Sequence, residues 1–131
     1  MEIITTHKNA DFDALASVFA ATLIYKEALA VLPKSINPNV KAFLSLHKDL
    51  FPFKTPGDVN MHEVSRLVVV DAPHWSRLDG VKDLRDKTDL DIHIWDHHKA
   101  SGDFRASKTC IEEVGAAVTL LSLQQIGRAH V

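Results

Sequence analysis

The chain has 131 residues, of which 46% are hydrophobic and 24% charged, and its formal net charge is −2 at pH 7. These values are typical of one soluble globular domain, or of part of a larger one, with enough apolar side chains to bury a core. They give no bulk electrostatic reason for tight binding to duplex nucleic acid, and a single cysteine, Cys110, excludes an intrachain disulfide framework and a thiolate metal cluster.

The N-terminal residues and the apolar stretches of the sequence predict the cellular compartment. Residues 1–2 lead directly into a strand pattern, without the basic and apolar regions of a signal peptide. The longest apolar stretch, residues 14–25, is too short to span a bilayer. We therefore expect a cytoplasmic protein without a membrane partner.

The first third of the chain predicts a strand, a helix and a second strand. Residues 2–6 predict the first strand, because four consecutive positions from Ile3 are β-branched. A helix is expected from about residue 11 to residue 27, with Asp11 or Asn9 as its cap and apolar side chains at helical spacing. Residues 29–32 predict the second strand.

The middle of the chain predicts a helix, a loop and a central strand. Asn37 and Pro38 are typical of a helix start, and the helix is expected to run to about His47. Residues 51–57 are rich in turn-forming residues and indicate a loop. The unbroken apolar run of residues 67–70 predicts a central strand that is buried on both faces.

The last part of the chain predicts a helix, two strands and a final helix. Residues 76–84 are expected to form a helix that begins at a serine cap, although Gly80 disfavours it. Residues 91–95 and a segment within 107–113 predict strands, and residues 115–125 have a helical pattern. Strands that alternate with helices predict an α/β fold, a Rossmann-like and mainly parallel β-sheet flanked by helices.

Three of the predicted strands end in side chains that bind metals or transfer protons. They are His7, Asp11 and Asp13 after the first strand, Asp71 after the central strand, and Asp96, His97 and His98 after the strand of residues 91–95. Because ligands bind at the edge where the C-terminal ends of parallel strands meet, we expect these side chains to share one site.

A purely structural origin explains only part of this set. Asp11 and Asp13 suit the start of a helix, where carboxylates cap the backbone and favour the helix dipole. Capping does not explain His7 on the preceding strand end. It also does not explain Asp71 after an apolar strand, where an unpaired carboxylate is costly to bury.

The composition of the set indicates its chemistry. Four carboxylates at one edge would repel one another, and two divalent cations relieve that repulsion. Oxygen ligands with some imidazole and no thiolate favour manganese or magnesium over structural zinc. Two such ions, about 3.5–4 Å apart, activate a bridging water and stabilise a phosphoryl group under attack. This predicts hydrolysis of phosphodiester or phosphoanhydride bonds.

The spacing His7-x-x-x-Asp11-x-Asp13, with Asp71 and residues 96–98, resembles the first three motifs of the DHH phosphoesterase superfamily. That superfamily includes RecJ-type exonucleases, oligoribonucleases and family II inorganic pyrophosphatases. The resemblance spans residues 1–125 and implies a DHH domain with two divalent cations, Mn²⁺ preferred or Mg²⁺. It also implies a phosphorylated small-molecule or short nucleic-acid substrate.

The resemblance further implies a role for each residue. His7 and Asp11 would hold one cation, Asp13 and His97 the other, and Asp71 would bridge the two. His98 would contact the scissile phosphate or the leaving oxygen, and Asp96 would orient the histidine pair. Five histidines match no family position and are interpreted as structural or surface residues: His47, His62, His74, His93 and His130.

The C-terminal part of the sequence departs from the family pattern. The family has a fourth motif, an aspartate on a later strand, and a substrate-binding domain, and we expect the chain to stop before both. Residues 126–131 read as the translation of a common sequencing-adapter sequence. We therefore predict an incomplete DHH domain over residues 1–125 and a non-native tail over residues 126–131.

Three functions stay open. A metal-dependent phosphoesterase is favoured, because the ligand residues of all three motifs are present. The alternative is a non-hydrolytic nucleotide- or metal-binding module at the N-terminus of a larger protein with CBS and tRNA nucleotidyltransferase-like domains, which residues 3–7 and 35–39 also resemble. A structural domain with capping and surface acids is the third. The substrate is open among pyrophosphate, a cyclic dinucleotide, a short oligonucleotide and a tRNA end.

Overall fold

A computed structural model describes residues 1–72, 74–95 and 108–110, and these residues form a five-stranded sheet in which every pair of neighbouring strands is parallel. The strands follow the order β2-β1-β3-β4-β5. They are β1 (Glu2–Thr5), β2 (Leu29–Ala30), β3 (Arg66–Val70), β4 (Asp91–Trp95) and β5 (Lys108–Cys110). The predicted α/β fold with a Rossmann-like parallel sheet is confirmed.

The central strand β3 divides the apolar core between the two faces of the sheet. Leu67 and Val69 pack into the cluster on one face, while Val68 and Val70 pack into the cluster on the other. Successive side chains of a strand point to opposite faces, so a continuous apolar run suits a strand covered on both sides. All four side chains are buried, as the sequence predicted.

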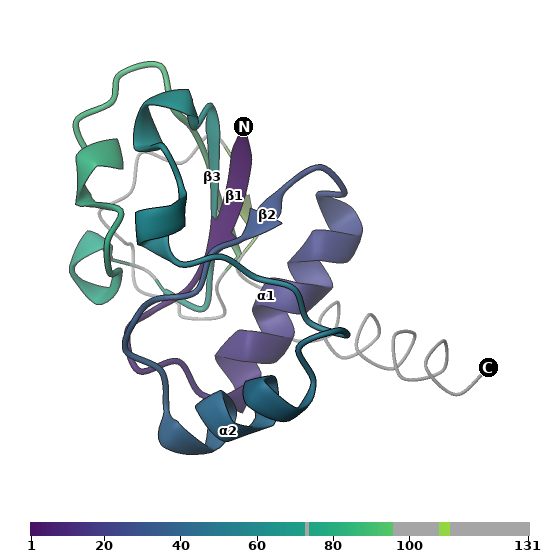
Figure 1. Cartoon of the computed structure of the whole chain (residues 1–131). Helices are drawn as coiled ribbons and strands as arrows, with labels where there is room; N and C mark the ends of the chain where they lie inside the picture. Colours follow the sequence, from purple (N-terminus) through teal and green to yellow (C-terminus); the bar gives the residue numbers. More distant parts are fainter. Residues whose placement is uncertain (73, 96–107, 111–131) are drawn as a thin grey trace.

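Two helices cover one face of the sheet (Figure 1). Helix α1 (Phe12–Ile24) contacts β1, β2 and β3, and α2 (Pro38–Leu46) contributes the buried Val40 and Leu44 to the same core cluster. The start of each helix is as predicted, with Asp11 and Asn37 as the N-caps. Helix α1 ends at Ile24 rather than near residue 27, because Tyr25 has left the helical conformation at φ −102° and ψ 79°.

The other face of the described sheet is covered by short 3₁₀ turns (Figure 1). They are η1 (Pro56–Asp58), η2 (Met61–Glu63), η3 (Trp75–Arg77) and η4 (Lys82–Leu84). The predicted helix over residues 76–84 is therefore wrong. Within the described part of the chain, no helix has the length and apolar character needed to cross a membrane.

Two features explain why residues 75–84 form turns instead of a helix. Their buried apolar side chains recur at intervals of three, which suits the 3₁₀ period better than 3.6; they are Trp75, Leu78, Val81 and Leu84. Gly80 interrupts the segment at φ +74°, and a Cβ there would lie 2.4 Å from the Cβ of Pro56. The predicted helix over residues 115–125 lies outside the described residues.

The strand order places a switch of direction between β1 and β3. From β1 the chain passes to β2 on one side, and it later returns to β3 on the other side of β1. In open parallel sheets ligands bind at such a switch point, outside the carboxyl ends of the strands. The residues that follow β1 and β3 are therefore the first place to look for a site.

Candidate metal centre

His7 lies just beyond the C-terminal end of β1 and is buried. Its Nδ1 lies 2.7 Å from the carbonyl oxygen of Lys8. Because a carbonyl oxygen can only accept a hydrogen bond, Nδ1 carries a proton and Nε2 is the nitrogen left to act as a ligand. Nε2 faces the carboxylate of Asp71, with 3.4 Å between Nε2 and Oδ2.

Asp71 follows β3 directly and adopts a left-handed backbone conformation, with φ at +58°. Its N–H donates to the carbonyl oxygen of Trp95 at 2.9 Å, so the end of β4 holds this peptide in place. A non-glycine residue in this region stores conformational strain, and such strain clusters at functional sites. The strained backbone directs the partly buried carboxylate of Asp71 toward His7.

Asp11 completes a group of three. It is the N-cap of α1, and its Oδ1 accepts a hydrogen bond from the N–H of Ala14 at 2.9 Å. A carboxylate has acceptor sites on both oxygens, so capping does not exhaust it. One ligand atom from each of His7, Asp11 and Asp71 lies within 4.8 Å of the other two. This spacing suits three ligands around one divalent cation.

Asp13 lies elsewhere in the first turn of α1. Its side chain is exposed, and its carbonyl oxygen accepts a hydrogen bond from the hydroxyl of Ser17 at 2.9 Å. Asp11 is exposed as well, but it is the N-cap residue with an extended backbone and precedes the helix. Among the described residues, the group of possible ligands accordingly contains Asp11 and not Asp13.

Residues 7–11 are held by the segment that precedes α2. Asn9 has a left-handed φ of +56°, and its N–H donates to the carbonyl oxygen of Ser35 at 2.7 Å. The N–H of Asn37 donates to the carbonyl oxygen of Ala10 at 3.1 Å. Asn9, one of the two caps considered from sequence, therefore shapes the loop, while Asp11 caps the helix.

A buried threonine joins the two strand ends that carry His7 and Asp71. The hydroxyl of Thr6 donates to the carbonyl oxygen of Val70 at 2.8 Å. Thr6 precedes His7 and Val70 precedes Asp71, so this bond fixes the spacing of the two ligands. The sequence interpretation missed Thr6, because its only signal was a polar residue at the end of a β-branched run.

The electrostatics of the group favour positive charge beside its two carboxylates. The pKa of His7 is raised above its ordinary value, chiefly by the hydrogen bond to Asp71. Desolvation acts in the opposite direction, and the Lys8 carbonyl and the charges of Asp71 and Asp11 raise the pKa further. The same two carboxylates that raise this pKa would attract a divalent cation.

The third predicted motif, Asp96, His97 and His98, lies outside the described residues. Trp95, the residue before it, ends β4 and accepts the hydrogen bond from Asp71. The β4 strand that leads into the motif is as predicted. The roles of these three residues stay predictions.

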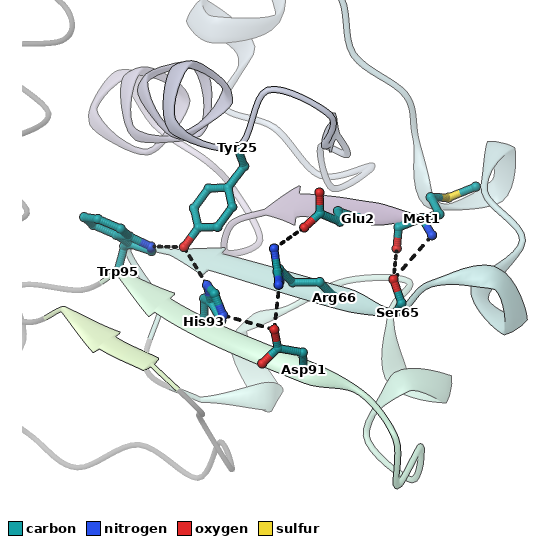
Figure 2. Close-up of polar contacts among 8 residues, drawn as sticks. All are labelled: Met1, Glu2, Tyr25, Ser65, Arg66, Asp91, His93 and Trp95. Atoms are coloured by element: carbon teal, nitrogen blue, oxygen red, sulfur yellow. Dashed lines mark hydrogen bonds and ion pairs between the residues drawn. The ribbon is translucent and has the colours of Figure 1, made fainter.

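A polar network lies on the α1 side of β4, and sequence interpretation did not find it (Figure 2). The hydroxyl of Tyr25 lies 2.7 Å from Nδ1 of His93 and accepts from Nε1 of Trp95 at 2.9 Å. Nε2 of His93 lies 3.1 Å from the carboxylate of Asp91. His93 is therefore a structural histidine, as interpreted from the sequence. The available signal was the alternation of Asp91, His93 and Trp95 along a strand.

Arg66 extends the network along the N-terminal ends of the strands (Figure 2). Its Nε donates to Asp91 at 2.8 Å, and its Nη1 pairs with Glu2. The hydrogen bond to Asp91 is the largest cause of a raised pKa for Arg66. The network thus joins β1, β3, β4 and the end of α1 on one side of the sheet.

Comparisons with known proteins agree with this geometry. The model of the DHH family, N-terminal domain, matches residues 2–124. The A-adding tRNA nucleotidyltransferase of Geobacter sulfurreducens is 37% identical over 124 residues. The match covers 93% of this chain but 14% of that protein. The chain therefore corresponds to a small part of this relative.

Proposed function

Because the chain belongs to the DHH family, we propose that its metal centre serves a phosphoesterase that hydrolyses phosphodiester or phosphoanhydride bonds. The substrate would be a nucleotide, an oligonucleotide or a polyphosphate. The observation that carries the proposal is the convergence of His7, Asp11 and Asp71 within 4.8 Å at the switch point of the sheet. No phosphate-binding loop competes with it in the sequence.

The three residues fit a hard divalent cation by their chemistry. Two carboxylates and one imidazole are ligands that manganese accepts, and water can fill the remaining positions. The tautomer of His7 is already set by Lys8, so Nε2 can serve as a ligand once its proton leaves. Asp71, held by Trp95, is the residue we propose as the bridge to a second cation.

The proposal includes a second cation beside the first. We propose Asp13 and His97 as its ligands, in line with the family pattern. His98 would contact the scissile phosphate or the leaving oxygen, and Asp96 would orient the two histidines. When bound, the two cations supply an activated water and neutralise the developing phosphoryl charge.

A second candidate function is a non-hydrolytic nucleotide- or metal-binding module of a larger cytoplasmic protein. The observation that favours it is the small share of the relative that this chain matches, 14%, together with that relative's description as an A-adding tRNA nucleotidyltransferase. In such a protein the domain would sense a nucleotide or bind a tRNA end while another domain performs the transfer. Both candidates require the cation, so metal binding alone does not separate them.

Calorimetric titration with Mn²⁺ tests the centre that both candidates share. We expect binding by the wild-type chain and a loss of affinity of about tenfold or more in Asp71→Asn, which keeps the shape but removes the charge. Asp83→Asn, at an exposed carboxylate remote from the centre in sequence, is the matched control and should bind as the wild type does. Equal affinities in the wild type and Asp71→Asn would refute the centre.

Hydrolysis assays on a version extended by the regions of the relative outside this match separate the two candidates. For the phosphoesterase, Asp71→Asn should lower turnover of an oligonucleotide, a cyclic dinucleotide or pyrophosphate on the order of a hundredfold. For the binding module, no substrate should be hydrolysed, and nucleotide affinity should depend on Mn²⁺.

A further inference from the structure

A pocket of about 800 Å³ lies between α1, α2, β2 and residues 50–55. We call it the lysine pocket. Its walls are mostly apolar and include Phe19, Phe51 and Phe53. The rings of Phe19 and Phe51 lie with their centroids 4.8 Å apart. A concave, largely apolar site of this size is typical of a ligand-binding pocket.

Every charged residue that lines this pocket is a lysine: Lys34, Lys41, Lys48 and Lys54. All four are exposed, and no carboxylate among the described residues lines the pocket. The chain as a whole carries a net charge of −2, so this concentration of positive charge does not follow from composition. The charge pattern selects an anionic ligand that also has apolar surface to bury.

The backbone beside the pocket argues against an extended peptide as that ligand. The N–H of Lys54 donates to the carbonyl oxygen of Ala30 at 2.8 Å. The N–H of Leu32 donates to the carbonyl oxygen of Lys54 at 2.9 Å. The main-chain groups on this side of β2 are therefore already paired. A peptide strand that adds to a sheet needs such groups to be available. Recognition must come from side chains, which here are aromatic rings and ammonium groups.

Neighbouring backbone segments connect the pocket with the metal centre. Lys34 and Ile36 line the pocket, and Ile36 forms a parallel bridge with Ala10 in the loop between His7 and Asp11. Three aromatic rings in contact also connect the start of α1 with the pocket. The ring of Phe12 contacts Phe43 at 5.7 Å, and Phe43 contacts Phe51 at 5.6 Å between centroids. Phe12 is half-exposed and follows Asp11 directly.

We propose that the lysine pocket binds single-stranded nucleic acid, with bases against the aromatic side chains and phosphates at the lysines. Aromatic platforms bordered by cations bind single strands without strong sequence preference. This inference rests on the proposed function in one respect, namely that the bound strand would place a phosphate at the neighbouring metal centre. It selects a nucleic-acid strand over pyrophosphate as the substrate class.

The test is fluorescence anisotropy of a labelled oligoadenylate RNA of about 12 nucleotides, titrated with the 131-residue chain in EDTA at low salt. The double variant Lys41→Glu, Lys48→Glu should weaken binding by about tenfold or more. The control double variant Lys26→Glu, Lys82→Glu changes the net charge equally at exposed lysines outside the pocket, and it should change affinity less than about twofold. Circular dichroism would confirm that both variants fold.

Phe51→Leu keeps the charge and removes one ring, so it should weaken strand binding several-fold. Any of three results would overturn the proposal: no binding by the wild type, equal losses in the two double variants, or tighter binding of an acidic phenylalanine-containing peptide than of the RNA. An unchanged affinity in Phe51→Leu would also count against it.

Asp71→Asn separates this inference from the proposed function. This variant should lose Mn²⁺ affinity, whereas strand binding by the wild type is measured in EDTA, without the cation. A wild-type chain that binds the strand but not Mn²⁺ would refute the phosphoesterase and leave the pocket standing. A chain that binds Mn²⁺ but not the strand would refute the pocket as a strand-binding site and leave the proposed metal centre standing.

Discussion

At the scale of single residues, the centre depends on hydrogen bonds that prepare each ligand before a cation arrives. The carbonyl of Lys8 sets the tautomer of His7, and the hydroxyl of Thr6 fixes the distance between two strand ends. Asp71 keeps a strained backbone that Trp95 holds from β4. Backbone and hydroxyl groups around a metal ligand typically matter nearly as much as the ligand itself.

The raised pKa of His7 predicts how the metal-free protein responds to pH. A histidine whose folded pKa lies above its ordinary value of 6.5 stabilises the fold fully below that pH. The contribution is lost as the pH rises through the raised pKa. In EDTA, the difference in unfolding free energy between the wild type and His7→Gln should therefore shrink as the pH rises above 6.5.

Denaturant unfolding at a series of pH values measures this difference. His62→Gln, which replaces an exposed histidine outside the centre, is the control with which the His7→Gln difference is compared. Because the same proton must leave before a cation binds, the Mn²⁺ affinity of the wild type should rise over the same pH range. A pH-independent gap between the wild type and His7→Gln would contradict the assignment of the Asp71 contact.

At the scale of elements, two strands and a helix are joined by side chains that local sequence patterns do not reveal. Tyr25, the residue that follows α1 as its C-cap, contacts two residues of β4, His93 and Trp95 (Figure 2). The carbonyl of Trp95 in turn holds Asp71. The end of α1 is thereby connected to the metal centre through β4.

Tyr25→Phe tests this connection. Removing the hydroxyl takes a partner from His93 and from Trp95, which should lower the unfolding free energy by about 1–2 kcal/mol. Because Trp95 holds Asp71, Mn²⁺ affinity should also fall several-fold at a temperature where the protein is fully folded. Ser65→Ala removes an exposed hydroxyl that Figure 2 shows bonded to Met1, and it should leave Mn²⁺ affinity unchanged.

Gly80 is the second test at this scale. An alanine there would have to keep a φ of +74° and would place its Cβ 2.4 Å from a side-chain carbon of Pro56. We expect Gly80→Ala to lower the unfolding free energy by about 1–3 kcal/mol in denaturant titrations. Gly57→Ala is the control, since nothing lies within 4 Å of its added Cβ, and its effect should stay within about 0.5 kcal/mol. Similar effects of the two substitutions would disprove the packing of Pro56 on Gly80.

At the scale of the whole molecule, the parallel sheet gathers residues that are distant in sequence. Ligands that follow β1 and β3 meet because both strands end at the same edge, next to the switch point of the order β2-β1-β3-β4-β5. The helices cover one face and the 3₁₀ turns cover the other, which leaves this edge to carry the chemistry (Figure 1).

The chain by itself should bind at least one divalent cation weakly and gain thermal stability from it by mass action. Melting curves recorded with Mn²⁺ and with EDTA measure this gain, and Ca²⁺ serves as a comparison ion. We further expect negligible hydrolysis of phosphoesters by residues 1–131 alone, and turnover when the regions of the relative outside this match are added. Robust turnover by the 131-residue chain would show that those parts are dispensable.

The sequence alone determined the strands and the order of the chemical groups. An unbroken apolar run such as residues 67–70 suits few structures other than a doubly covered strand, and the polar residue after it must lie at the strand end. The α/β class, the two caps and the candidates His7, Asp11 and Asp71 followed from patterns of this local kind.

Only the tertiary structure decided which of these residues meet. Ligand atoms of Asp11, His7 and Asp71 lie within 4.8 Å of one another, and Asp13 is not part of this group among the described residues. The predicted helix near Gly80 failed partly because Gly80 has a φ of +74°, and Pro56, a residue distant in sequence, packs closely against it there. Contacts of this kind depend on how the chain folds back on itself, and no local pattern encodes them.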